Sequence, residues 1–189
     1  MYKTMFNKEL YLKSTDRIFL KNVSKKDINN IHEYASDPEV SFFIGWKLKN
    51  NINETNSLVE EMISNQKKGT HQYASVVLKS TKKVIGNIMI FNHDKISNQA
   101  EIGYVFNKEN WNKGYGTESL KLLVDFAFDY LKIHKLVAKV VEVNVGSCKI
   151  LEKNKFILEG KLRDHFRIEG KYYSGLLYGL INEKDQLNN

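Results

Sequence analysis

The sequence predicts an α/β (α+β) fold, with a mixed, mostly antiparallel sheet of about seven strands and helices on both faces. Three strand-like runs, 72–79, 83–91 and 100–106, are separated by short polar turns, which favours antiparallel neighbours. A glycine turn, a helix and an almost continuously apolar run at 136–143 come next. An antiparallel half joined to a strand-helix-strand half predicts a mixed sheet.

The chain up to Ser36 predicts one strand and one helix. Residues 16–23 read as the strand, and Ser24 stands where a helix N-cap belongs, with Asp27 three residues later. The helix is expected to end near Ser36, because Pro38 disfavours helical geometry in the residue before it.

A further helix is predicted from Thr55 to Lys67, where apolar residues recur on one face and Gly69 follows. Between the two helices, residues 42–46 read Phe-Phe-Ile-Gly-Trp. We expect a loop there, although it is too apolar for a plain linker.

After the glycine turn, an amphipathic helix of about four turns is predicted. Its apolar residues are Leu120, Leu123, Val124, Ala127, Phe128 and Leu131. The run 136–143 predicts a buried strand. A short helix at 147–153, a strand at 156–162, a polar segment at 163–171 and a final strand at 172–181 follow.

Length and composition favour one domain spanning residues 1–189. A single cysteine, Cys148, excludes an intramolecular disulfide, and charged residues interrupt the first 20 positions, so we expect a cytoplasmic protein. No run approaches the roughly 18–20 apolar residues of a membrane helix. The formal net charge of +7 suits an anionic ligand, whereas the scattered lysines argue against a nucleic-acid partner.

The stretch from Glu101 to Ser119 contains the first candidate site: a strand, a G-Y-G-T-E-S turn at 114–119 and the start of a helix. Glycines let the backbone turn its N–H groups inward, and the helix adds its positive end. Lys113 adds a charge. The pattern indicates either a phosphate site or a simple strand-to-helix turn.

Other cofactor sites lack support in the sequence. Ser119 stands where a dinucleotide fingerprint requires a third glycine or alanine, and no P-loop sequence is present. The five histidines show no paired ligand spacing, and Cys148 stands alone, so no metal site is predicted.

A second motif, N-V-G-S-C-K-I-L-E-K-N-K-F at 144–156, directly follows the buried strand. Together with W-N-K-G-Y-G-T-E at 111–118, it resembles the GNAT acetyltransferase superfamily, in particular the branch of the ribosomal-protein N-terminal (alanine/serine) acetyltransferases. The resemblance covers about residues 16–182, and the two motifs are in register. It departs from the branch at Lys155, where relatives have glycine, and at Ser174, where many have an acidic residue.

The resemblance implies that acetyl-CoA lies between the strand ending near Phe106 and the strand at 136–143. Backbone groups of Val105 and Phe106 would hold the pantetheine arm. Backbone N–H groups of a loop would hold the pyrophosphate; the loop residues are Asn112, Lys113, Gly114, Tyr115, Gly116 and Thr117. The side chains of Lys113 and Lys149 either face phosphates or are solvated.

The resemblance also implies direct acetyl transfer to a primary amine, with no covalent acyl-enzyme. A terminal α-amine with a pKa near 8 is roughly a tenth neutral at pH 7, whereas a lysine amine is neutral in about one molecule in two or three thousand. A modest base therefore suffices for the α-amine.

Three residues would carry the chemistry. Glu101 is the candidate base, directly or through water; the alternative is a carboxylate paired with a nearby lysine. Ser147 is the candidate acid for the leaving thiolate, in place of the tyrosine of many GNAT enzymes, or it merely caps its helix. Asn144 would position pantetheine or an ordered water.

The acceptor would meet the apolar loop at 42–46, with Trp46 flanking a peptide or small amine, and the segment 163–171. The alternative for Trp46 is core packing, which is the more common role of an aromatic residue after a helix. A polyamine site should collect carboxylates, and only Asp37, Glu39 and Glu54 lie near Trp46 in the sequence. The residues leave open a protein N-terminus, a polyamine, an aminoglycoside or an amino sugar.

Two other classes remain as alternatives. One is a non-catalytic acetyl-CoA-binding sensor, and the other is a nucleic-acid-binding module. Homodimers are common in the branch that the chain resembles, but no residue in the sequence establishes one.

Overall fold

The computed structural model describes residues 8–44 and 47–183. The strands in this part of the chain are β1 (Ile18–Lys21), β2 (His71–Leu78), β3 (Val84–Asp94), β4 (Gln99–Phe106), β5 (Lys135–Val141), β6 (Ile157–Ile168) and β7 (Lys171–Ile181). The α-helices are α1 (Ile28–Ala35), α2 (Pro38–Ile44), α3 (Ile52–Lys68), α4 (Tyr115–Asp125) and α5 (Val145–Lys153). None of the described helices combines the length and the apolar character needed to cross a membrane.

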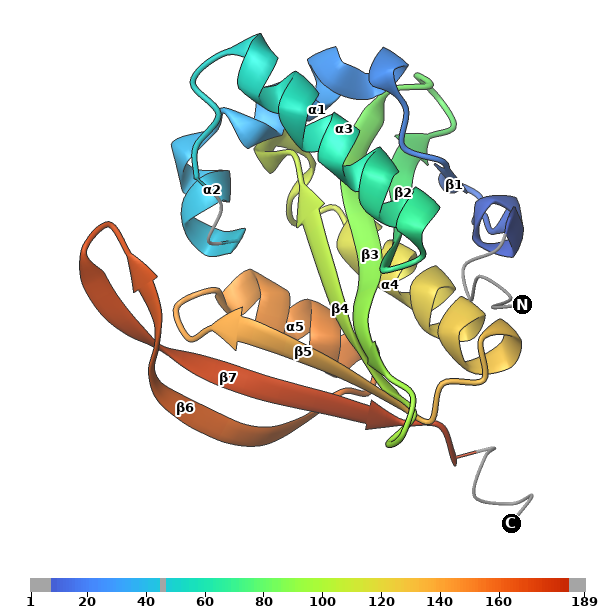
Figure 1. Ribbon diagram of the computed structural model, residues 1–189, viewed down its shortest axis with the longest axis vertical. Helices are drawn as coiled ribbons and strands as arrows, with labels where there is room; N and C mark the ends of the chain where they lie inside the picture. Colours follow the sequence, from blue (N-terminus) through green and yellow to red (C-terminus); the bar gives the residue numbers. More distant parts are fainter. Residues whose placement is uncertain (1–7, 45–46, 184–189) are drawn as a thin grey trace.

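One mixed sheet contains these seven strands in the order β1-β2-β3-β4-β5-β7-β6 (Figure 1). β4 and β5 are parallel, and the other neighbours are antiparallel. Helices α1, α2 and α3 cover one face of the sheet, and α4 and α5 cover the other. The predicted mixed, mostly antiparallel sheet with helices on both faces is confirmed.

Each face of the sheet has its own hydrophobic core. The core under α1 and α3 contains Ile31, Tyr34 and Val59, all fully buried. The core under α4 contains Leu120 and Leu123, also fully buried. Burial of one large aliphatic side chain is worth about 1.5–3 kcal/mol, so these two layers hold the helices onto the sheet.

Helix α3 begins earlier than the predicted Thr55. Asn51 caps it, because its side chain accepts hydrogen bonds from the backbone N–H groups of Asn53 and Glu54. The helix ends as predicted at Gly69, which has a φ of 74° in the left-handed region.

The prediction of a loop at 42–46 is wrong up to Ile44, the last residue of α2. Pro38 follows α1 as expected, but it also stands in the first turn of α2, where its missing N–H costs nothing. The Asp37 side chain accepts hydrogen bonds from two N–H groups of that turn, at 2.8 and 3.2 Å. The remainder of the predicted loop, 45–46, lies outside the described residues.

The polar segment predicted at 163–171 is mostly strand. β6 continues to Ile168, and the turn into β7 is Glu169-Gly170, with φ values of 49° and 81°. β6 lies at the edge of the sheet and most of its side chains are exposed. An edge strand exposed in this way has no alternating apolar pattern for sequence reasoning to detect.

The one parallel pair in this sheet is short. β4 and β5 pair only over Gln99, Ala100 and Glu101. Beyond that point β4 stays beside β3 up to Phe106, while β5 stays beside β7 up to Val141. The carboxyl ends of β4 and β5 therefore part, as the diverging arrows in Figure 1 show.

Candidate active site

A cavity of about 840 Å³ lies where β4 and β5 part. Its wall includes residues from both strands, from the segment between β4 and α4, and from the first turns of α4 and α5. α2 and β6 also contribute residues to the wall. Ligand pockets commonly measure about 300–1,000 Å³ and lie beyond the carboxyl ends of parallel strands, so both size and place suit a ligand.

The glycine loop forms one end of this cavity. Asn112 and Gly114 are left-handed, with φ values of 57° and 84°, and α4 begins at Tyr115. Such a backbone turns successive N–H groups toward one concave side, and the N–H groups of a first helical turn have no partner within the helix. Asn112, Gly114, Gly116 and Thr117 all line the cavity, so the loop is suited to bind an anion.

The loop is fixed against α5. A Cβ atom on Gly116 would lie 2.6 Å from Cδ1 of Ile150, so the helices approach closely there. The side-chain amide of Asn154 also donates a 3.2 Å hydrogen bond to the carbonyl oxygen of Thr117. These contacts leave the concave side of the loop open, and the residues present therefore fit a pyrophosphate group.

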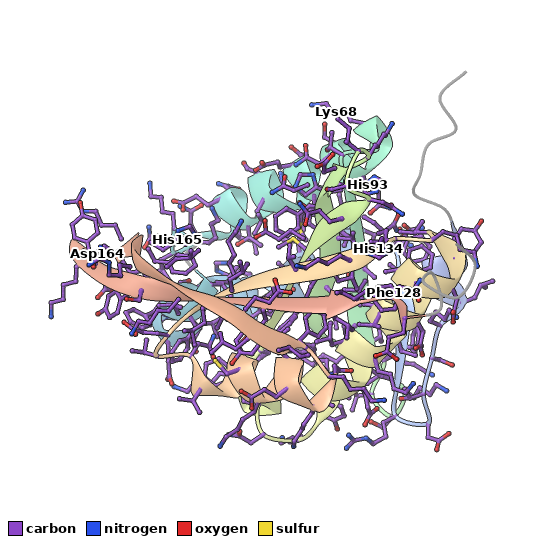
Figure 2. All side chains as sticks on the ribbon, turned by 90° about the horizontal axis from the view of Figure 1, so that it is seen from below. Lys68, His93, Phe128, His134, Asp164 and His165 are labelled. Atoms are coloured by element: carbon purple, nitrogen blue, oxygen red, sulfur yellow. The ribbon has the colours of Figure 1, made fainter. Side chains whose placement is uncertain are left out.

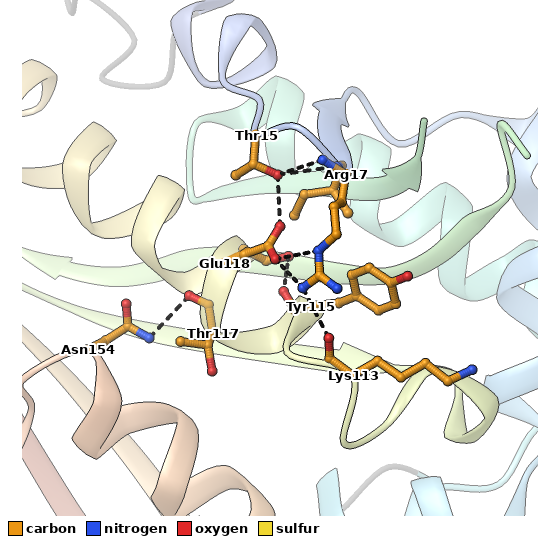
Figure 3. A network of polar contacts seen from close by, with 9 residues as sticks. Thr15, Arg17, Lys113, Tyr115, Thr117, Glu118 and Asn154 are labelled. Carbon is orange, nitrogen blue, oxygen red and sulfur yellow. Dashed lines mark hydrogen bonds and ion pairs between the residues drawn. The ribbon is translucent and has the colours of Figure 1, made fainter. Parts of the chain in front are cut away.

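A polar network from the segment before β1 braces the loop from the opposite side (Figure 3). Arg17 forms an ion pair with Glu118, and its Nη2 donates a 3.0 Å hydrogen bond to the carbonyl oxygen of Lys113. The guanidinium lies over the ring of Tyr115, 4.6 Å from its centroid. Thr15 donates a 2.8 Å hydrogen bond to Oε2 of Glu118. Sequence reasoning missed Arg17, because no local pattern links residues so far apart in the chain.

The predicted phosphate-facing side chains lie in different places. Lys149 lines the cavity, whereas Lys113 and Tyr115 are absent from its wall as far as the structure describes the chain. Figure 3 shows the Lys113 side chain pointing away from the Arg17–Glu118 pair. Of these two lysines, only Lys149 thus remains as a candidate for a side-chain contact to phosphate.

The edge of β4 forms the middle of the cavity. Val105 and Phe106, the residues predicted to hold a pantetheine arm, both line it. The carbonyl oxygen of Phe106 already accepts a 2.9 Å hydrogen bond from the indole N–H of Trp111. Since β5 diverges after Glu101, the β4 edge beyond it has no strand partner on that side in the described chain.

Glu101 lies in the cavity wall at the point where β4 and β5 part. Its side chain is 15% exposed, and its Oε2 lies 2.9 Å from Nζ of Lys139. The side-chain amide of Asn92 donates a weaker, 3.4 Å hydrogen bond to the same oxygen. Glu101 is therefore both the lysine-paired carboxylate that we considered as an alternative and a cavity residue.

Asn144 and Ser147 lie together at the start of α5. Asn144 is the N-cap: its Oδ1 accepts a 3.0 Å hydrogen bond from the backbone N–H of Ser147. The alternative that Ser147 caps this helix is therefore wrong. Both residues line the cavity.

A further cavity residue, Tyr104, was not predicted as part of the site. Its hydroxyl lies 2.7 Å from Oγ of Ser147 and 3.1 Å from the Ser147 carbonyl oxygen. Burial raises the pKa of the Tyr104 phenol well above its ordinary value. The sequence placed Tyr104 on a strand, but it could not show that α5 would pack over that strand.

The candidate base and the candidate acid lie on opposite faces of β4. Successive side chains of a strand alternate between faces, so Glu101 shares a face with Val105, which packs in the core under α1 to α3. Tyr104 packs in the core under α4 and α5, close to Ser147. A group bound in the cavity would therefore have the Glu101 carboxylate on one side and the Ser147 hydroxyl, backed by Tyr104, on the other.

Residues 17–157 match the model of the acetyltransferase (GNAT) domain. The chain belongs to the GNAT acetyltransferase family. It is 27% identical over 170 residues to the uncharacterized N-acetyltransferase p20 of Bacillus licheniformis, across 90% of this chain and 96% of that protein. Its fold is similar to that of a ribosomal L7/L12 α-N-protein acetyltransferase, with a TM-score of 0.80, 19% identity and coverage of 89% and 92% of the two chains. It is also similar to the fold of Vibrio cholerae spermidine N-acetyltransferase in complex with CoA and spermine, with a TM-score of 0.78, 20% identity and coverage of 90% and 98%.

Membership of the GNAT family confirms the resemblance carried by the two motifs and the expected enzyme class, an N-acetyltransferase. It supports acetyl-CoA-dependent acetylation of an amine. The roles of individual residues stay predictions. From the positions expected in the sequence analysis for acetyl-CoA and the acceptor, we name the part of the GNAT cavity around residues 112–117 the donor end, and the part lined by α2 and β6 the acceptor end.

The acceptor end of this GNAT cavity contains aromatic side chains. Phe43 and Phe166 line it, and the ring of Phe43 lies edge-on to Trp111 with the centroids 5.9 Å apart. Phe42, the neighbour of Phe43 on α2, lies edge-on to Tyr173 at 5.6 Å, outside the cavity lining. His165 on β6 lines the same end, and Figure 2 shows it beside Asp164, at the end of the molecule opposite His134.

Two carboxylates line the cavity in the part of the chain that the structure describes, Glu39 and Glu101. Glu39 forms an ion pair with Lys108, just as Glu101 does with Lys139. Trp46, the predicted acceptor contact, lies outside the described residues.

Proposed function

We propose that this N-acetyltransferase moves the acetyl group of acetyl-CoA directly to a primary amine, and that the acceptor is the N-terminal α-amine of a protein. The pairing of the cavity carboxylates supports this choice of acceptor. Glu39 and Glu101 each already have a lysine partner. A polyamine carries further ammonium groups that need carboxylate partners when they leave water, whereas a peptide N-terminus brings one amine followed by neutral backbone.

Glu101 is the base of the proposed reaction. Lys139 and Asn92 both donate to Oε2, which leaves Oε1 to accept a proton from the amine, directly or through water. A terminal α-amine is roughly a tenth neutral at pH 7. The base therefore has only to remove the proton that the nitrogen sheds once it has attacked, and a modest base is sufficient.

The donor end would hold acetyl-CoA. The N–H groups of residues 112–117 would bind its pyrophosphate, and the open β4 edge would bind its pantetheine arm. Asn144 fixes the backbone of Ser147, whose hydroxyl would stabilise the leaving sulfur. Supporting this arrangement, four of the six loop residues line the same cavity as Val105, Phe106, Asn144 and Ser147.

The test is the release of free thiol from acetyl-CoA over a panel of acceptors. The panel contains peptides with a free N-terminus, the same peptides with the α-amine blocked and a lysine retained, spermidine, and an aminoglycoside. We expect turnover with the free peptides and none with the blocked ones. Ser147→Ala should slow this turnover. Ser57→Ala, which changes an exposed serine on α3, should leave the turnover unchanged.

Two results would contradict the proposal. Faster turnover of spermidine than of any peptide would assign the enzyme to small amines. Silence across the panel, while acetyl-CoA still raises the melting temperature, would favour the non-catalytic sensor.

A further inference from the structure

The contact between Tyr104 and Ser147 joins two elements that are remote in sequence. Tyr104 comes from β4, beneath the cavity, and Ser147 comes from the first turn of α5. The two hydroxyl oxygens are 2.7 Å apart, and both residues line the cavity. The phenol also lies 3.1 Å from the Ser147 carbonyl oxygen. Ser147 thus donates its backbone N–H to Asn144, and its hydroxyl and carbonyl oxygens both lie within hydrogen-bond distance of the Tyr104 phenol.

The direction of the hydrogen bond between the two hydroxyls decides where the seryl proton points. If Ser147 donates, its proton is occupied by Tyr104. If Tyr104 donates, the seryl proton is free to point into the cavity. A phenol is the better donor and the poorer acceptor of the two. It has one proton, and Oγ, at 2.7 Å, is a nearer acceptor for it than the Ser147 carbonyl oxygen, at 3.1 Å. Because burial raises the pKa of Tyr104, the phenol also keeps its proton throughout the neutral pH range.

We propose that Tyr104 is a positioning residue of the transfer: it donates to Oγ of Ser147 and so directs the seryl proton toward the sulfur of acetyl-CoA. This inference rests on the proposed function. The amine nitrogen forms the new C–N bond, its surplus proton passes to Glu101 or water, and the C–S bond breaks with its electron pair going to sulfur. The Ser147 hydroxyl stabilises that charge by hydrogen bonding, and solvent supplies the proton of the free thiol.

The inference explains how a serine can serve at this position. An isolated seryl hydroxyl rotates among three staggered positions and also competes for nearby backbone acceptors. A donor fixed on the sheet removes those alternatives without touching the substrate. When Tyr104 donates to Ser147, the polarised seryl hydroxyl should also form a stronger hydrogen bond to the sulfur of acetyl-CoA.

The first experiment is a double-mutant cycle with Tyr104→Phe, Ser147→Ala and the double variant. We expect Tyr104→Phe to lower kcat by about three- to tenfold, with the KM for acetyl-CoA unchanged, since one indirect hydrogen bond is lost. The double variant should be no slower than Ser147→Ala, because Tyr104 acts only through Ser147. Losses that multiply, or an unchanged kcat in Tyr104→Phe, would overturn the inference.

A second measurement needs no acceptor. The thiol pKa of CoA bound to the enzyme is followed by the ultraviolet absorbance of the thiolate. A hydroxyl donor at the sulfur lowers that pKa, so Ser147→Ala should raise it and Tyr104→Phe should raise it part of the way. A bound-thiol pKa in Tyr104→Phe equal to that of the unmodified protein would overturn the inference. If the bound-thiol pKa rises in Tyr104→Phe but no acceptor in the panel is acetylated, the result would support the inference and contradict the proposed acceptor.

Tyr178→Phe is the matched control. Tyr178 is also a buried tyrosine beside α5, and its hydroxyl donates a 3.1 Å hydrogen bond to Oε1 of Glu152. Removing this phenol should cost a similar amount of stability and leave the bound-thiol pKa unchanged. A rise equal to that in Tyr104→Phe would show a general packing effect and contradict the inference.

Discussion

The donor end and the acceptor end of the cavity are held together by different kinds of contact. At the donor end, backbone groups of the loop are fixed by polar contacts from both sides: Arg17 binds the carbonyl of Lys113, and Asn154 binds that of Thr117. At the acceptor end, aromatic rings of α2 rest edge-on against other elements. Hydrogen bonds to backbone specify positions closely, whereas aromatic contacts tolerate shifts. This difference fits the proposed function, in which the donor end binds one cosubstrate and the acceptor end can adapt to its acceptor.

The largest effect should come from Gly114→Val. The φ of 84° at Gly114 is strained for a β-branched residue, at a cost of about 1–2 kcal/mol or more, and the new side chain would press on Arg17. Relaxation of the loop should raise the Kd for acetyl-CoA about tenfold or more. Isothermal titration calorimetry measures this directly.

Gly170→Val provides the matched comparison at the other end. Gly170 has a φ of 81° in the turn between β6 and β7, and a Cβ atom added there would meet no described atom within 4 Å. Gly170→Val should lower the melting temperature about as much as Gly114→Val does, and it should leave the Kd for acetyl-CoA unchanged. Equal changes in Kd for both variants would erase the distinction between the two ends.

A smaller effect is expected from Arg17→Met. The variant removes the ion pair to Glu118 and the hydrogen bond to the Lys113 carbonyl, but keeps an apolar stem over Tyr115. Because exposed ion pairs contribute little, we expect the Kd for acetyl-CoA to rise only about threefold. The control is Lys25→Met, which breaks an exposed pair with Glu60 far from the loop. An identical Kd in Arg17→Met and the unmodified protein would show that the loop holds its shape unaided.

The two ends also differ in how well the sequence predicts them. The loop is encoded locally: Gly114 supplies the left-handed turn, and the residues of the next helical turn follow directly. Arg17 and Tyr104 act across long separations, and their contacts depend on which elements pack together, which no local pattern contains. At the acceptor end, Pro38 both follows one helix and opens another, and the sequence pattern revealed only the first of these two effects.

The smallest effect is expected from Glu39→Gln at the acceptor end. Glu39 is half-exposed and paired with Lys108, so its charge is already neutralised before an acceptor arrives. We expect the Kd for acetyl-CoA to stay the same and the KM for a peptide N-terminus to change by less than about threefold. Isothermal titration calorimetry measures the Kd for acetyl-CoA, and steady-state kinetics measures the KM for the peptide and for spermidine. Glu60→Gln is the remote control. A tenfold rise in the KM for spermidine, with the peptide unaffected, would show that Glu39 exchanges Lys108 for a substrate ammonium. The acceptor end would then be specific for polyamines through a carboxylate that is paired only in the absence of substrate.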